Sequence, residues 1–145
     1  MNVLFVKSQR QFFIVFLKCK RLGVLFDALA YVFLQCNVIW SDSAFIFGAG
    51  YKKENAKKWQ LLNFVVGQAK LAIYKSRKSK IVSDGDEQGV ELLPLFKALV
   101  KARIRVDFGF YLLMDNIDEF VSQWCYNDAL CSVVEEQLVF SLLLL

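Results

Sequence analysis

One amphipathic segment, LLNFVVGQAKLAIYKSRKSK at residues 61–80, constrains the fold of this chain more than any other. Its apolar residues Leu62, Val66, Ala69 and Ile73 recur at steps of three and four, which places them on one face of an α-helix. The end of the segment is basic, and cations there complement the negative end of the helix dipole. The segment therefore predicts a long helix that carries both a core face and a basic end.

A second long helix is predicted beyond residues 81–89, IVSDGDEQG, which read as an exposed acidic loop. Its apolar residues recur at helical spacing and are expected to face inward: Leu92, Leu95, Phe96, Leu99, Val100, Val106, Phe110 and Leu113. We therefore expect a mainly α fold with two long antiparallel helices, about 54–80 and 90–114, and shorter helices packed around them.

Shorter elements are less well defined by the pattern. Residues 27–40 and 118–125 are predicted as helices, and Asp115-Asn116 as the junction before the second of these. Residues 45–47 suit either a short strand or a buried linker, and the glycines at 48 and 50 indicate a loop. The tail from residue 126 suits short helix or strand, and the fold of residues 1–40 is uncertain.

The chain is unusually apolar for its length. At 145 residues it can form a real core, and 57% of its residues are hydrophobic, above the usual 45–50% or so for soluble domains. This excess predicts exposed apolar surface, which indicates either a piece of a larger protein or a surface that binds a partner protein. The longest charge-free run, residues 28–41, is shorter than the roughly 20 apolar residues of a membrane-spanning helix. We expect no transmembrane segment and an intracellular location, nuclear or cytoplasmic.

Charge is distributed unevenly along the chain. Residues 1–80 carry fourteen Lys and Arg against three Asp and Glu, whereas residues 81–145 carry four against eleven. The basic half predicts a polyanionic partner or attraction to the acidic half, while simple solvation of both halves is an equal alternative.

Composition also excludes much catalytic chemistry. The chain contains no His, so a Ser-His or Cys-His nucleophilic site and a His-containing zinc site are both excluded. Four cysteines form no CxxC pair and are expected to be reduced and buried. The acids at 84, 86 and 87 belong to a polar loop, and those at 115, 118 and 119 suit a helix start. We expect neither an enzyme nor a bound cofactor.

Two stretches carry a family resemblance: LLNFVVGQAKLAIYKSRKSK, and LFKALVKARIRVDFGFYLLMDNIDEFVSQWCYNDALCSV further on. Together they resemble the C-terminal region of non-LTR retrotransposon polyproteins of the vertebrate LINE type, downstream of the reverse transcriptase. The matching pattern is LLNFxxGQAKxAIxxxRK, an acidic loop, LVKARxRxDFxFY, a Trp and a Leu-Cys-Ser-Val end. It spans about residues 45–140 and contains no catalytic residues.

The resemblance also implies a degenerate zinc knuckle before this region. Cys36 would be the last ligand of a Cys-x2-Cys…His-x4-Cys segment, with Trp40 as the aromatic after it. Tyr31 stands at the His position, and Phe16 and Cys19 at the two first positions. Tetrahedral zinc needs four ligands, and Phe supplies none, so the resemblance implies a lost metal site. It divides the chain into an apolar segment, 1–44, and a helical domain, 45–145.

The role implied by the resemblance is residual, sequence-nonspecific binding of RNA or DNA. Phosphate contacts of this kind are made by basic residues and depend strongly on salt. The candidates are Lys70, Lys75, Arg77, Lys78, Lys80, Lys101, Arg103 and Arg105. Trp59 and Tyr74 are candidates for stacking on bases, with core packing favoured for Trp59. The alternatives are a small helical protein-interaction module, association with anionic membrane surfaces, and a remnant without selected function.

Overall fold

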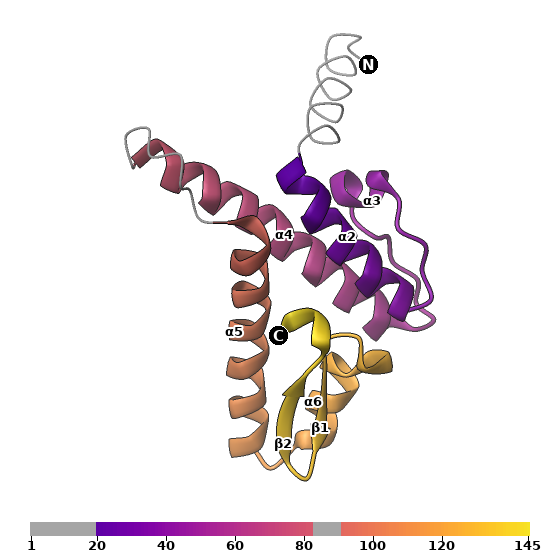
Figure 1. Ribbon diagram of the computed structural model, residues 1–145. Coiled ribbons are helices and arrows are strands. Elements are labelled where there is room, and N and C mark those ends of the chain that lie inside the picture. Colours follow the sequence, from indigo (N-terminus) through magenta and orange to yellow (C-terminus); the bar gives the residue numbers. More distant parts are fainter. Residues whose placement is uncertain (1–19, 83–90) are drawn as a thin grey trace.

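The computed structural model describes residues 20–82 and 91–145 (Figure 1). This part of the chain is mainly helical, as predicted, with one small antiparallel sheet. The helices are α2 (Lys20–Gln35), α3 (Asp42–Phe47), α4 (Ala56–Val82), α5 (Leu92–Leu113) and α6 (Ile117–Trp124). The strands are β1 (Cys131–Val134) and β2 (Gln137–Phe140), and two single 3-10 turns are η1 (Tyr126–Asp128) and η2 (Leu142–Leu144).

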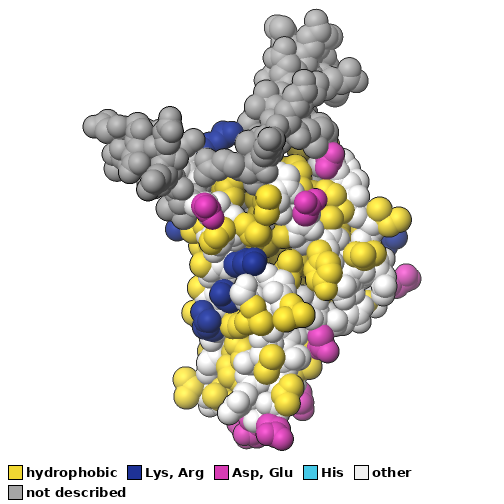
Figure 2. Space-filling view, viewed as in Figure 1, with side chains coloured by type: hydrophobic (Ala, Val, Ile, Leu, Met, Phe, Trp, Pro, Cys, Tyr) yellow, Lys and Arg dark blue, Asp and Glu magenta, His cyan; other side chains and the backbone are white. Residues whose placement is uncertain are grey.

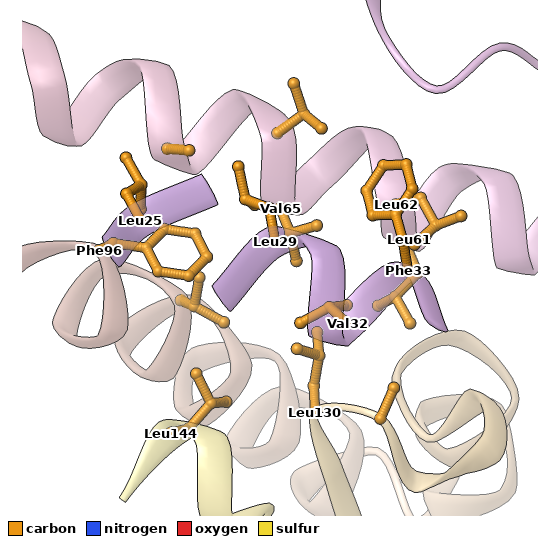
Figure 3. Close-up of a cluster of buried hydrophobic side chains, with 14 of the residues drawn as sticks. Leu25, Leu29, Val32, Phe33, Leu61, Leu62, Val65, Phe96, Leu130 and Leu144 are labelled. Carbon is orange, nitrogen blue, oxygen red and sulfur yellow. The ribbon is translucent and has the colours of Figure 1, made fainter. Parts of the chain in front are cut away.

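The core lies where α2 crosses α4 and the first half of α5 (Figure 1). The predicted stripe of α4 is buried at Leu62, Val66, Ala69 and Ile73. Figure 3 shows Leu25 and Leu29 of α2 packed beneath Val65 of α4, with Phe96 of α5 beside them. Each such side chain contributes about 1.5–3 kcal/mol when removed from water, so this three-helix contact is the main stabilising feature.

The two long helices separate after this contact. Ser76 is the last residue of α4 described as buried, and the last turns of the helix extend beyond the helices that it packs against (Figure 1). Helix α5 begins beside the second half of α4 and runs away from it toward α6 and the strands. Nearly all of the predicted acidic loop, from residue 83 on, lies outside the described residues.

The second half of α5 corrects the sequence prediction. Val106, Phe110 and Leu113 were expected to face inward, but they are 68%, 56% and 88% exposed. The buried residues of α5 are Leu92, Phe96, Val100 and Ile104, and no buried residue of the helix lies beyond Ile104. The reason is that α2 and α4 cover only the first half of α5. The spacing of apolar residues does not show where the neighbouring helices end.

Two helices end at the same kind of cap. At the end of α2 the backbone N–H of Val38 donates to the carbonyl of Phe33 over 2.9 Å, with Asn37 left-handed at φ 61°. At the end of α5 the N–H of Asn116 donates to Tyr111 over 2.9 Å, with Asp115 at φ 52°. Both are Schellman motifs, which satisfy carbonyls of the last helical turn. Helix α2 ends at Gln35, earlier than the predicted 40, and it also includes residues before the predicted start at 27. The predicted junction at 115–116 is confirmed.

The remaining ambiguities resolve into one helix and one hairpin. Residues 42–47 form α3, so the expectation of a strand or linker at 45–47 is wrong: Phe45 is buried against Phe26 of α2, with ring centroids 4.9 Å apart. The tail forms the β1–β2 hairpin, in which Cys131 pairs with Phe140 and Val134 with Gln137. Its two-residue turn places Glu135 and Glu136 at positive φ, 51° and 64°.

Candidate nucleic-acid interface

The basic residues predicted to contact phosphate fall into four separate places. Lys75 and Arg77 lie exposed near the end of α4, and Lys78 and Lys80 follow on the same helix, with side chains outside the described part. Lys101 and Arg105 lie on α5 beside the C-terminal segment, and Arg103 lies on another face of α5. Lys70 lies against α3.

The end of α4 combines exposure with a shared face. Tyr74 is 62% exposed, and Lys70 and Arg77 lie four residues before it and three residues after it. Residues at these separations are neighbours on a helix surface. Tyr74 is thus an exposed ring among basic residues, whereas the stacking candidate Trp59 is partly buried against the core, in line with the packing role favoured for it.

Lys70 has a structural contact of its own. Its ammonium donates to the carbonyl of Ile46 over 3.3 Å and lies 5.7 Å from the ring centroid of Phe45. Both partners belong to α3, so Lys70 links α3 to α4. A phosphate contact by Lys70 would compete with this link.

The basic residues of α5 form a row that the sequence analysis did not identify completely. Lys97, Lys101 and Arg105 follow one another at steps of four and so lie on one face. Lys97 donates to the terminal-residue carbonyl of Leu145 over 3.4 Å, and the Arg105 guanidinium lies 5.0 Å from the Phe140 ring centroid. Figure 2 shows basic side chains gathered over α5. We call these three residues the α5 row. The spacing of four residues could have identified Lys97 as a member of it from the sequence.

Arg103 does not belong to this row. Its Nε lies 3.3 Å from Oδ1 of Asp107, one turn further along α5. The other oxygen of that carboxylate, Oδ2, accepts a hydrogen bond from the indole of Trp124 over 3.0 Å. Arg103 is therefore partly neutralised by a carboxylate that also holds α6, which makes it a weaker phosphate candidate than the α5 row.

Asn63 of the LLNF motif has a structural role in the glycine loop. Its Oδ1 accepts from the N–H of Ala49 over 2.8 Å, and its Nδ2 donates to the carbonyls of Gly50 and Trp59 over 2.8 and 2.9 Å. Gly48 has φ 89°, and a Cβ there would lie 2.9 Å from Oδ1 of Asn63. Glycine at 48 and asparagine at 63 are therefore required together.

The two described positions of the implied zinc knuckle, Tyr31 and Cys36, have different surroundings. Tyr31 is exposed on α2, while Cys36 is buried in the core, and burial raises the pKa of its thiol to about 11. Trp40 packs against Phe33, with ring centroids 5.0 Å apart. Phe16 and Cys19 lie outside the described residues. Within residues 20–82 and 91–145, no cluster of three His, Cys, Asp or Glu side chains is suited to a metal ion.

The pattern of motifs has a counterpart in a known protein. The transposon TX1 uncharacterized 149 kDa protein of Xenopus laevis is 34% identical to the chain over 121 residues, which is 83% of this chain. The similarity supports a retrotransposon-derived origin. The chain spans only 9% of the length of that relative. No protein-family model matches the chain, and no solved structure matches it.

The lengths and hydropathies of the described helices decide whether any of them could span a membrane. Among the helices in the described ranges, none is both long and apolar enough to cross a bilayer. The two longest, α4 and α5, both carry several basic residues.

Proposed function

We propose that the chain is a non-catalytic, retrotransposon-derived piece that binds the phosphates of RNA or DNA without reading sequence. The observation that carries the proposal is the α5 row, three cations on one helix face beside the C-terminal segment. A phosphate would compete with the contacts of Lys97 and Arg105 there, as it would with that of Lys70, but Lys101 has no such contact in the described residues. A step of four residues advances about 6 Å along a helix, so the row is an extended cationic line that suits a phosphate backbone. Similarity to a transposon-encoded protein supports the retrotransposon-derived origin in this proposal.

The end of α4 is the second part of the proposed interface. Lys75 and Arg77 are exposed on turns that project from the body, and an exposed Tyr74 ring lies among them. Cations track the backbone of a single strand, and an aromatic ring stacks on its bases regardless of their identity. This combination favours single-stranded RNA or DNA over a duplex as the tighter ligand.

A non-catalytic role follows from the available chemistry. The chain has no His, so an imidazole cannot act as the base. Arg and Lys bind phosphate but have pKa values too high to act as general bases at neutral pH without a strong perturbation. The proposal therefore assigns binding to this chain and no bond-breaking step.

The test is a titration of labelled single-stranded RNA and duplex DNA with two matched triple variants. The first is Lys97→Gln, Lys101→Gln and Arg105→Gln, which neutralises the α5 row. The second, Lys52→Gln, Lys53→Gln and Lys57→Gln, removes equal charge from the segment before and at the start of α4. Loss of three phosphate contacts lowers the salt dependence of single-strand binding by a slope of about 2. We expect this change in the first variant and not in the second.

A third variant separates the two parts of the interface. Changing Lys75, Arg77, Lys78 and Lys80 to Glu is expected to weaken single-strand binding more than duplex binding, because acidic residues would repel a strand from the neighbouring Tyr74 ring. Equal weakening by the control and the α5 row variant, in chains with unchanged circular dichroism, would show that net charge rather than this surface governs binding.

The exposed end of α5 favours a second candidate function, binding of a protein surface. Val106, Phe110 and Leu113 form an apolar strip at helical spacing beyond the reach of α2 and α4. In a protein as large as the Xenopus relative, such a strip would pack against another part of the same polypeptide. Salt-independent association of the isolated chain, abolished by Phe110→Ser with Leu113→Ser, would support this role.

A further inference from the structure

Two cysteines that are not part of the proposed interface lie in direct contact. Cys125 follows the last residue of α6, and Cys131 is the first residue of β1. Their Sγ atoms are 3.8 Å apart, within hydrogen-bonding distance for sulfur. A disulfide has an S–S length of about 2.0 Å, so side-chain rotation over less than 2 Å would join them. Cys36, the other described cysteine, is buried elsewhere in the core.

The two thiols differ in accessibility. Cys125 is partly exposed, whereas Cys131 is buried, and the Cys131 sulfur also lies 3.6 Å from the carbonyl oxygen of Trp124. A reagent in solution therefore meets Cys125 first. Cys131 is protected from outside reagents but lies beside the sulfur of Cys125.

The segment between the cysteines is already held in place. Asn127 donates to the carbonyl of Gln35 at the end of α2 over 3.1 Å, and Ala129 and Leu130 are buried. The N–H of Ser141 donates to the carbonyl of Leu130 over 2.9 Å. Because both ends of this short segment are fixed by independent contacts, the two sulfur atoms are kept near one another.

We propose that Cys125 and Cys131 form a thiol-modification site, in which Cys125 reacts with a small-molecule disulfide and Cys131 then closes an intramolecular disulfide. Neither cysteine belongs to the proposed nucleic-acid interface, although Cys131 pairs in the hairpin with Phe140, the ring that Arg105 contacts. It gives the chain a response to the thiol–disulfide state of its surroundings.

The pKa shifts of the two thiols agree with the roles given by their accessibility, with Cys125 reacting first. The hydrogen bond from Cys131 lowers the pKa of Cys125, an effect larger than the opposing effects of burial and of Asp128. The same hydrogen bond, and then burial, raise the pKa of Cys131. Thiolates are the nucleophiles in disulfide exchange, so Cys125 attacks first.

The reaction balances in two exchange steps. The Cys125 thiolate attacks one sulfur of the small disulfide, whose S–S bond breaks, and one small thiolate leaves. Cys131 then loses its proton to solvent and attacks Sγ of Cys125, which releases the second small thiolate. The two cysteines are oxidised by two electrons, and the small disulfide is reduced to two thiols.

The probe is glutathione disulfide, mixed with reduced glutathione at set ratios and equilibrated with the folded full-length chain. Free thiols are then alkylated at low pH. A protease that cleaves before Asp128 separates Cys125 from Cys131 unless a disulfide joins them. We expect joined fragments under oxidising ratios, and separate alkylated fragments under reducing ratios.

Variants and stability give two further readouts. In Cys131→Ala the reaction is expected to stop at a glutathione adduct on Cys125, whereas Cys36→Ala is expected to behave like the wild type. Closing a seven-residue loop is expected to raise the melting temperature of the wild-type chain by about 5 °C. A chain that stays folded and yields only free thiols, or only the Cys125 adduct, in the presence of Cys131 would overturn the proposal.

Discussion

The indole N–H of Trp124 donates to the Asp107 carboxylate over 3.0 Å, and this bond fastens α6 to α5. Trp124 is buried, and its ring packs edge-on against Phe64 of α4 with centroids 4.8 Å apart. The bond therefore fixes a ring that touches both long helices.

Removing the acceptor leaves a buried donor without a partner. We expect Asp107→Ala to lower the free energy of unfolding by about 1–3 kcal/mol, measured by urea denaturation. Asp107→Asn keeps an oxygen acceptor and is the matched control, with an expected loss below about 1 kcal/mol. Equal stability of Asp107→Ala and the wild type would contradict this role of the carboxylate.

A second prediction concerns Asn63, which holds the loop of residues 48–50. Asn63→Asp keeps the acceptor for Ala49 but loses both donor bonds, to Gly50 and Trp59. Since hydrogen bonds contribute about 1 kcal/mol each, we expect thermal denaturation to show a loss of about 2 kcal/mol. Gln68→Glu, on the same helix but without these contacts, makes the same chemical change as a control; equal losses in both variants would refute the assignment.

A third prediction concerns alkaline pH. Burial raises the pKa of Cys36 from the ordinary 9.0 to about 11, with Lys58 acting weakly in the opposite direction. The folded state therefore holds this proton more tightly than the unfolded chain does. The resulting stabilisation is complete below the unfolded pKa of 9.0 and is lost as pH rises through about 11.

The rise in the Cys36 pKa corresponds to about 3 kcal/mol of unfolding free energy, which is lost completely only well above pH 11. Urea midpoints at neutral pH and near pH 11 measure it, with Cys36→Ala as the reference because all other groups titrate in both chains. We expect the wild type to lose about 2 kcal/mol more than the variant on this change of pH, because about half of the folded thiols are still protonated near pH 11. Parallel losses would show that Cys36 has the same pKa in the folded and the unfolded chain, and would contradict the prediction.

The exposed strip on α5 gives a fourth prediction. Phe110→Ser with Leu113→Ser removes apolar surface that is already exposed, so stability should change by less than about 1 kcal/mol. The same pair of substitutions at Phe96 and Val100, both fully buried, should prevent folding. A large loss of stability in the exposed pair would mean that the strip is covered within the chain.

The residues of the core were predictable where spacing alone decides burial. The stripe from Leu62 to Ile73 is buried because α4 contacts its partners along that whole length. Spacing failed at Val106 and Phe110, because a periodic pattern identifies a helix face but not where the neighbouring helices end.

Turn chemistry explains a second kind of failure. The hairpin turns through Glu135 and Glu136 at positive φ, a conformation for which Asn-Gly is the usual signal. The sequence contains no such signal at this point, so strand and helix could not be separated. Asn37 and Asp115, by contrast, are residue types that accept the left-handed conformation, and the junction at 115 was predicted.

The candidate site was only partly predictable. Lys101 and Arg105 were identified, but Lys97 was missed and Arg103 was grouped with them, although Asp107 holds it on another face. The contact between Cys125 and Cys131 depends on the turn between α6 and β1. It could not be predicted from the sequence, because the two cysteines do not form a CxxC pair.

The most direct measurement of the central claim is the salt dependence of single-stranded RNA binding by the wild-type chain. If the α5 row alone contacts phosphate, the slope of log K against log salt concentration should be about −2, and contacts from the end of α4 as well should steepen it to about −5. A slope near zero, or no binding at low salt by a chain shown to be folded, would contradict the proposed nucleic-acid role.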